Sequence, residues 1–211
     1  METSIFFKGQ DQTLELYTRI LCDIRPEQTE IIYIFGQTKD NESLVLDEVS
    51  ELWNKMGVST KIMIDQGTTN HGYPGYHTWL SALLKNGVPA ENIIPLDIPA
   101  DLNTLTESEA LTDYMSQKKI SSATIICPPF HQVRAFSTLV SSIIKKNLSI
   151  KIYNKPSDPK DWQANVFHSQ GVLEASRKEL IQEETKRIET YHKKGDILSV
   201  KEILEYLDSR K

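Results

Sequence analysis

The chain has 211 residues, of which 39% are hydrophobic and 25% are charged, so it is long enough for one sizeable core and short for two. Its formal net charge of -5 argues against a nucleic-acid-binding surface, which needs a basic face to displace counterions. No stretch approaches the ~20 apolar residues of a membrane span, and residues 1–8 lack the pattern of a signal peptide, so we expect a cytoplasmic protein.

Helices and strands are expected to alternate along the chain. Apolar residues three and four apart predict helices over residues 11–24, 42–56, 76–86, 105–118 and 131–147. Short apolar or β-branched runs predict strands over residues 31–35, 60–64, 92–96, 123–127 and 148–153. Because strands that alternate with helices pair in parallel with right-handed crossovers, we expect an α/β fold, a three-layer Rossmann-like sandwich with a mainly parallel sheet of about five strands.

The composition changes toward the C-terminus. Residues 173–194 are dense in Glu, Lys and Arg with a thin apolar stripe, and residues 198–207 predict a short amphipathic helix. We therefore divide the chain into a Rossmann-like domain at residues 1–170 and a helical extension at residues 171–211. The extension packs on the same domain or against a second copy in a homodimer, although a solvated charged face is the commoner explanation of such runs. His168 and His192 are expected at the surface, and Cys22 and Cys127 as buried free thiols.

The most informative segment is residues 123–136, where an apolar run ends at Pro128 and Pro129. Proline cannot donate to a strand ladder, so the strand must end there. The following helix places His131 and Arg134 one turn apart near its N-terminus, where free N–H groups favour an anion. His131 is the best candidate for a general acid or base, because imidazole titrates near neutral pH. Alternatively, Arg134 merely pairs with a neighbouring acid and His131 only caps the turn.

Ligands of open parallel sheets bind beyond the carboxyl ends of the strands, so the strand-end loops supply the candidate site. Its predicted ligand-binding residues are Gly36, Gln37, Asp65, Gly67, Asp97, Asn103, Thr104, Glu107, His131 and Arg134. Asp65 ends the second strand, where dinucleotide and methyl-donor binders often place an acid on a ribose hydroxyl. A solvated strand-end acid is the alternative, because the first loop lacks the glycine triplet of a dinucleotide fingerprint.

The loop at residues 66–75 is glycine-rich, polar and long for a connection between a strand and a helix. His71, Tyr73, Tyr76 and His77 lie in or beside it and could grip a flat ligand group. No tight helical spacing of histidines supports a metal, so we predict no metal site and no particular cofactor. The chain also lacks the nucleophile elbow of serine hydrolases and the phosphate loop of nucleoside triphosphatases.

Taken together, these motifs resemble the SanA/ElyC/YdcF-like family, a widespread bacterial α/β family of largely unassigned chemistry. The resemblance covers about residues 30–155 and rests on motif order and spacing, most specifically on His131-x-x-Arg134 after a strand and on Asn103-Thr104 at a helix start. It implies a Rossmann-like fold with a polar crevice built from these motifs. The chain departs from the family at Gln37, where relatives usually have a second glycine, at Gly75-Tyr76, where relatives have an acid, and at the Glu-Asn pair, here Thr106-Glu107 or Glu107-Ser108.

Two functions of different classes stay open. The first is a small-molecule-binding protein that holds an anionic or nucleotide-like ligand, such as an S-adenosylmethionine-like molecule, between Arg134 and the Asn103-Thr104 turn. As an enzyme, it would hydrolyse phosphate-containing substrates. The second is a non-catalytic regulatory or scaffold protein that binds another protein through its C-terminal helices.

Overall fold

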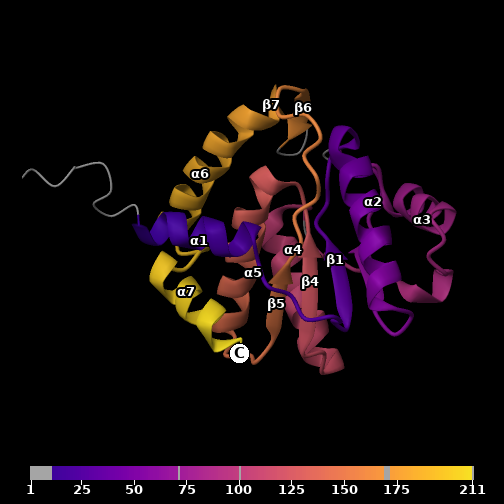
Figure 1. Ribbon diagram of the computed structural model, residues 1–211, viewed down its shortest axis with the longest axis horizontal. Coiled ribbons are helices and arrows are strands. Elements are labelled where there is room, and N and C mark those ends of the chain that lie inside the picture. The colour runs from indigo at the N-terminus through magenta and orange to yellow at the C-terminus, as the bar shows by residue number, and fades with distance from the viewer. Residues whose placement is uncertain (1–10, 71, 100, 169–171, 211) are drawn as a thin grey trace, which may run out of the picture.

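The computed structural model describes residues 11–70, 72–99, 101–168 and 172–210. At its centre lies a sheet of five parallel strands in the spatial order β3-β2-β1-β4-β5 (Figure 1). The strands are β1 Ile31–Ile34, β2 Lys61–Asp65, β3 Ile93–Leu96, β4 Ser122–Ile126 and β5 Lys151–Asn154. Each predicted strand is therefore present, with bounds shifted by at most a few residues.

Strand β1 holds the middle of the sheet, between β2 and β4. Its first residue, Ile31, pairs with Lys61 on one side and with Ala123 on the other. All of β1 is buried, because helices cover both faces of the sheet, and this explains why the strand is an uninterrupted apolar run. The strand order reverses between β1 and β4, and the ligands of such sheets bind beyond the carboxyl ends of the strands at that reversal.

Helices flank the sheet on both sides (Figure 1). They are α1 Asp11–Leu21, α2 Lys39–Met56, α3 Tyr76–Lys85, α4 Thr104–Lys118, α5 Pro129–Lys145, α6 Arg177–Lys194 and α7 Val200–Ser209, with a 3₁₀ turn at Ala90–Asn92. α2 and α3 pack on one face around Val45 and Trp79, and α1, α4, α5 and α7 pack on the other around Phe136. This arrangement confirms the predicted three-layer α/β fold. No helix of the described residues is long and apolar enough to cross a membrane.

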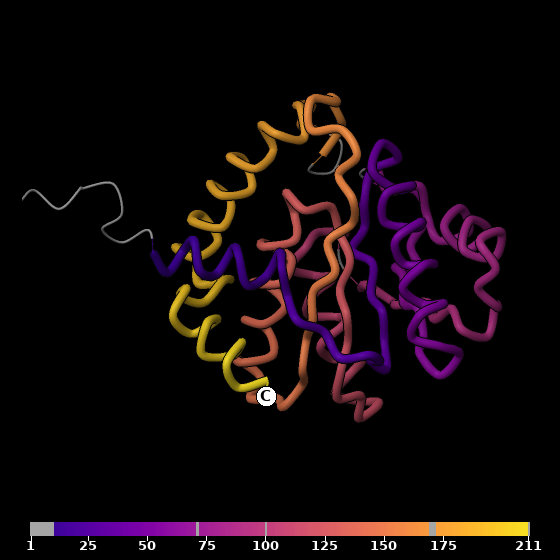
Figure 2. The backbone as a smooth tube through the Cα atoms, viewed as in Figure 1, coloured from indigo at the N-terminus to yellow at the C-terminus, as the bar shows by residue number. Residues whose placement is uncertain are grey.

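The segment before α6 differs from the expected helical extension over residues 171–211. Strands β6 Asn165–His168 and β7 Leu173–Ser176 form an antiparallel hairpin instead. α6 begins only after Ser176 because this residue caps it: the Ser176 hydroxyl accepts the Glu179 N–H, and the Glu179 carboxylate accepts the Ser176 N–H. α6 then packs along α5, and α7 packs against α1 and α5 (Figure 2).

An ion pair fixes the end of α7 to the domain. The Arg210 Nη2 atom is 2.7 Å from Asp23 Oδ1, and Nη1 is 2.8 Å from Asp23 Oδ2. Asp23 Oδ2 also accepts the backbone N–H and the side-chain amide N–H of Asn154, the last residue of β5. The C-terminal helix is thus tied to an edge strand of the sheet through a two-point contact.

The two cysteines do not share one environment. Cys127 follows β4 and is buried as predicted, whereas Cys22 is exposed, so the prediction of a second buried thiol is wrong. The reason is that α1 ends at Leu21, before Cys22, so that Cys22 does not continue the buried stripe of Leu16 and Ile20.

Candidate functional site

A cavity of about 380 Å³ lies beyond the carboxyl ends of the central strands. Its walls come from the loop after β1, the N-terminal turn of α4, the first turns of α5, the β6–β7 hairpin and α6. The sequence-predicted residues that line it are Gly36, Gln37, Asn103, Thr104, Glu107 and Arg134. The structure therefore brings together side chains from three separate strand-end segments, as expected for the edge of a parallel sheet.

The other predicted residues lie elsewhere. Asp65, Gly67, Asp97 and His131 are not among the described residues that line the cavity, and His71 lies outside the described part of the chain. Asp65 is buried at the end of β2, where its Oδ1 accepts the Gly67 N–H at 3.0 Å. Burial raises the pKa of Asp65. The role of this carboxyl group on a ribose hydroxyl stays a prediction.

Asn103 has a structural task at the cavity wall. Its Oδ1 accepts the N–H groups of Leu105 and Thr106 at 3.0 and 3.1 Å, and its own N–H donates to the Thr106 hydroxyl, which forms a capping box at the start of α4. Its Nδ2 donates to the carbonyl of Asp101. Both ends of the Asn103 side chain are therefore engaged in holding the helix N-terminus at the cavity.

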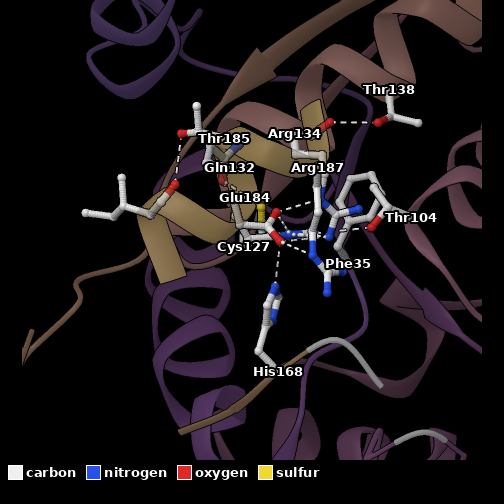
Figure 3. Close-up of polar contacts among 12 residues, drawn as sticks. Phe35, Thr104, Cys127, Gln132, Arg134, Thr138, His168, Glu184, Thr185 and Arg187 are labelled. Atoms are coloured by element: carbon white, nitrogen blue, oxygen red, sulfur yellow. Dashed lines mark hydrogen bonds and ion pairs between the residues drawn. The ribbon is translucent and has the colours of Figure 1, made fainter. Parts of the chain in front are cut away.

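Behind the cavity lies a buried cluster centred on Glu184 of α6 (Figure 3). The Arg134 Nε donates to Glu184 Oε2 at 2.5 Å, and the Arg134 Nη2 donates to Oε1 at 3.3 Å. His131 Nδ1 is 2.9 Å from Oε2, and His168 Nε2 is 2.8 Å from Oε1. Arg187 approaches from the next turn of α6, with its Nε 3.8 Å from Oε1. One carboxylate thus joins α5, α6 and the β6–β7 hairpin.

The protonation states of this cluster follow from its geometry. Burial acts to raise the pKa of Glu184, but the Arg134 charge and the contacts from His131 and His168 outweigh it and hold that pKa well below its ordinary value. Burial and the Arg134 charge lower the pKa of His131 to about 4, so its imidazole is neutral at pH 7. His131 Nδ1 lies between an acceptor, Glu184 Oε2 at 2.9 Å, and a donor, Arg134 Nη2 at 3.0 Å, while its Nε2 faces the Thr104 hydroxyl at 3.5 Å.

His131 is therefore a positioning residue. It holds Glu184 on one side and faces Thr104, a cavity-lining residue, on the other. The predicted role of His131 as general acid or base stays a prediction, and its burial away from the cavity gives that role no contact with a ligand. Arg134 does pair with an acid, as the alternative interpretation held, yet it also lines the cavity.

Sequence reasoning missed the contribution of α6 and the β6–β7 hairpin. His168, expected at the surface, is buried with 6% of its area exposed, because the hairpin turns it toward Glu184; His192 is exposed as expected. Leu180, Glu184, Arg187 and Tyr191 recur at helical spacing along α6, and that repeat is the sequence signal that could have revealed the inward face.

Glu107 is the buried acid of the cavity wall, with 3% of its area exposed. Its Oε1 accepts the Gly36 N–H at 2.7 Å and the Tyr33 hydroxyl at 2.9 Å. A Cβ atom at Gly36 would lie 3.3 Å from the Leu102 side chain and 3.4 Å from this oxygen, so glycine allows the close approach. Burial raises the pKa of Glu107 to about 8, against the opposing effect of both hydrogen bonds.

Among the described residues, His131, His168 and Glu184 form a group whose ligand atoms lie within 4.8 Å of one another, as in a metal site. Arg134 already supplies a positive charge to the same carboxylate oxygens. A cation would have to displace this guanidinium group and leave it buried without a partner, which is costly. The geometry is that of an ion-pair cluster.

Comparison of the chain with models of protein families, with characterised proteins and with solved structures finds no match. The functional argument therefore depends on the geometry of the cavity itself.

Proposed function

We propose that the chain binds a small anionic or nucleotide-like molecule in the cavity, with Arg134 and Arg187 on its anionic group. The observation that carries this proposal is that both arginines line the cavity while their guanidinium groups approach one buried carboxylate, Glu184. The Arg187 Nε is 3.8 Å from Glu184, too far for a hydrogen bond, and no other partner for Arg187 occurs among the described residues. Its planar fork of donors is free for phosphate or carboxylate oxygens.

The acidic residues that line the cavity leave the part beside the two arginines open to an anion. The raised pKa of Glu107 keeps this carboxyl group mainly neutral at pH 7. Asp196 is the other acidic residue of the described lining, and it follows the C-terminal end of α6, beyond Tyr191. The Glu184 carboxylate is already paired with Arg134, and His131 and His168 also contact it.

The proposed resemblance to the SanA/ElyC/YdcF-like family agrees with this function. Its two most specific motifs, Asn103-Thr104 and the helix with Arg134, both contribute residues to the lining of one cavity. The alternative of a scaffold protein needs the C-terminal helices for a partner, whereas α6 directs Leu180 and Glu184 into the domain. Hydrolysis of a phosphate-containing substrate is the enzymatic form of the proposal.

Titration calorimetry with inorganic phosphate, AMP and S-adenosylmethionine tests the proposal. The informative variant is Arg187→Gln, because loss of Arg134 would also strand the buried Glu184. We expect Arg187→Gln to weaken binding of the anionic probes at least about tenfold, the effect of losing a charge-assisted hydrogen bond.

The matched control is Lys186→Gln, which removes the same charge from the neighbouring, solvent-facing position of α6. The Lys186 side chain is 67% exposed and pairs with Glu183. We expect it to keep the wild-type affinity within about twofold. Equal affinities for Arg187→Gln and wild type, or no binding of any probe, would refute the proposed function.

A further inference from the structure

The two oxygens of the Glu107 carboxyl group have different surroundings. Oε1 receives both available donors, the Gly36 N–H and the Tyr33 hydroxyl. Oε2 has no hydrogen-bond partner among the described residues. It is nevertheless not fully buried, because it retains some accessible surface. Because Glu107 lines the cavity, Oε2 opens into the space where the ligand is proposed to bind.

This asymmetry is compatible with a carboxylic acid. In the acid form, the carbonyl oxygen accepts hydrogen bonds and the hydroxyl oxygen donates one. An ionised Glu107 would instead leave a charged oxygen without a donor from any described residue, on a side chain with 3% residue exposure, which is costly. The titratable groups that face it are Tyr33 on β1, Asp65 at the end of β2, Tyr73 in the next loop, Cys127 after β4 and Arg134 on α5. The Asp65 charge disfavours ionisation, and the Arg134 charge only partly offsets burial.

We propose that Glu107 is the proton-bearing donor of the cavity, and that its Oε2–H binds an oxygen of a fully ionised oxyanion held by the two arginines. This inference rests on the proposed function and deepens it, because it specifies the ligand group. A group that can only accept, such as sulfate, a carboxylate or the dianion of a phosphate ester, satisfies both the guanidinium donors and the Glu107 hydroxyl. An ionised Glu107 would instead repel that group.

The test uses sulfate, whose charge does not change over the relevant pH range. With a Glu107 pKa of about 8, sulfate binding to the wild type falls about 30-fold between about pH 6 and about pH 9.5, because only the acid form is competent. Glu107→Gln keeps an oxygen toward Gly36 and Tyr33 and presents an amide N–H that cannot titrate. We expect its sulfate affinity to change less than about threefold over the same range.

The matched control is Glu109→Gln, which removes a carboxylate from an exposed position of the same helix and should retain the wild-type pH dependence. Tyr33→Phe provides a second variant: it removes one donor to Oε1, so the pKa of Glu107 rises and the loss of binding moves to higher pH. Carboxyl ¹³C NMR of glutamate-labelled protein follows the protonation of Glu107 without any ligand.

The possible results separate the two proposals. Sulfate binding that is constant with pH in the wild type, or a Glu107 carboxyl signal that titrates near pH 4.5, its ordinary value, would overturn the role of Glu107 and leave the proposed anion site intact. A strong preference for phosphate over sulfate near pH 6 would also overturn it, because an ionised acceptor selects the anion that carries a proton. Absence of sulfate and phosphate binding at every pH would overturn the proposed function itself.

Discussion

Replacing Glu184 with glutamine removes the negative charge on which the buried cluster depends. The substitution keeps the shape of the side chain and one accepting oxygen, so it creates little cavity. It leaves the Arg134 guanidinium, whose side chain is 7% exposed, without its counter-charge. Loss of one partner from a buried ion pair costs about 3 to 5 kcal/mol, because the remaining charge stays desolvated. We therefore expect Glu184→Gln to lower the free energy of unfolding at pH 7 by about that amount.

Urea unfolding followed by circular dichroism measures this loss. The matched control is Glu183→Gln, the neighbouring position, where the acid forms a surface pair with Lys186 and should contribute less than about 1 kcal/mol. Arg134→Met alone should also be destabilising, whereas combining it with Glu184→Gln should recover about 1 to 3 kcal/mol relative to the sum of the single losses. A loss below about 1 kcal/mol in Glu184→Gln, or strict additivity in the double variant, would refute the reasoning.

Two further predictions concern acid pH and the C-terminal helix. The pKa of His131 is lowered to about 4 from 6.5, so between these two values the native state resists a proton that the unfolded chain accepts. This residue alone therefore lowers the free energy of unfolding by about 3 kcal/mol as the pH falls through that interval. Urea unfolding of wild type and His131→Gln checks this, and a stability difference that is constant with pH would contradict it. Arg210→Ala should cost about 2 to 3 kcal/mol in the same assay, since it removes the hydrogen bonds to Asp23 and to the Ile152 carbonyl, and a loss below about 0.5 kcal/mol would show that the ion pair is dispensable.

The sheet could be predicted from the sequence because its central strands, β2, β1 and β4, are buried on both faces. A strand such as β1 then reads as an uninterrupted apolar run, and the helices between the strands force parallel pairing. The β6–β7 hairpin carries no such signal. Its strands have only four residues each, too short a run for their alternation to stand out, and they are held by the packing of Val166 and Leu173 near Phe130, a contact distant in sequence.

The part of the site that comes from strand ends was also predictable, since the topology rule selects those loops whatever their chemistry. The contribution of α6 was harder to predict, because in a helix rich in Glu, Lys and Arg the spacing of a few residues is a weak signal for the buried face. Leu180 decides this in the structure: it is fully buried, and the turns that follow it carry Glu184 and Arg187 to the same side. The environment then sets the chemistry, so the histidine predicted to titrate near neutral pH is held neutral.

The titrations of His131 and Glu107 should change the free energy of unfolding in opposite directions as the pH changes. The pKa of Glu107 is raised to about 8 from 4.5, so the native carboxyl group keeps a proton that the unfolded chain has lost, and its contribution to stability falls as the pH rises through that interval. Between about pH 4.5 and about pH 6.5 this trend cancels that of His131, at about 1.4 kcal/mol per pH unit each. The wild type should therefore show little dependence on either group there. His131→Gln should lose stability as the pH rises, and Glu107→Gln should lose it as the pH falls; slopes of the same sign in both variants would show that the two groups are not held neutral together.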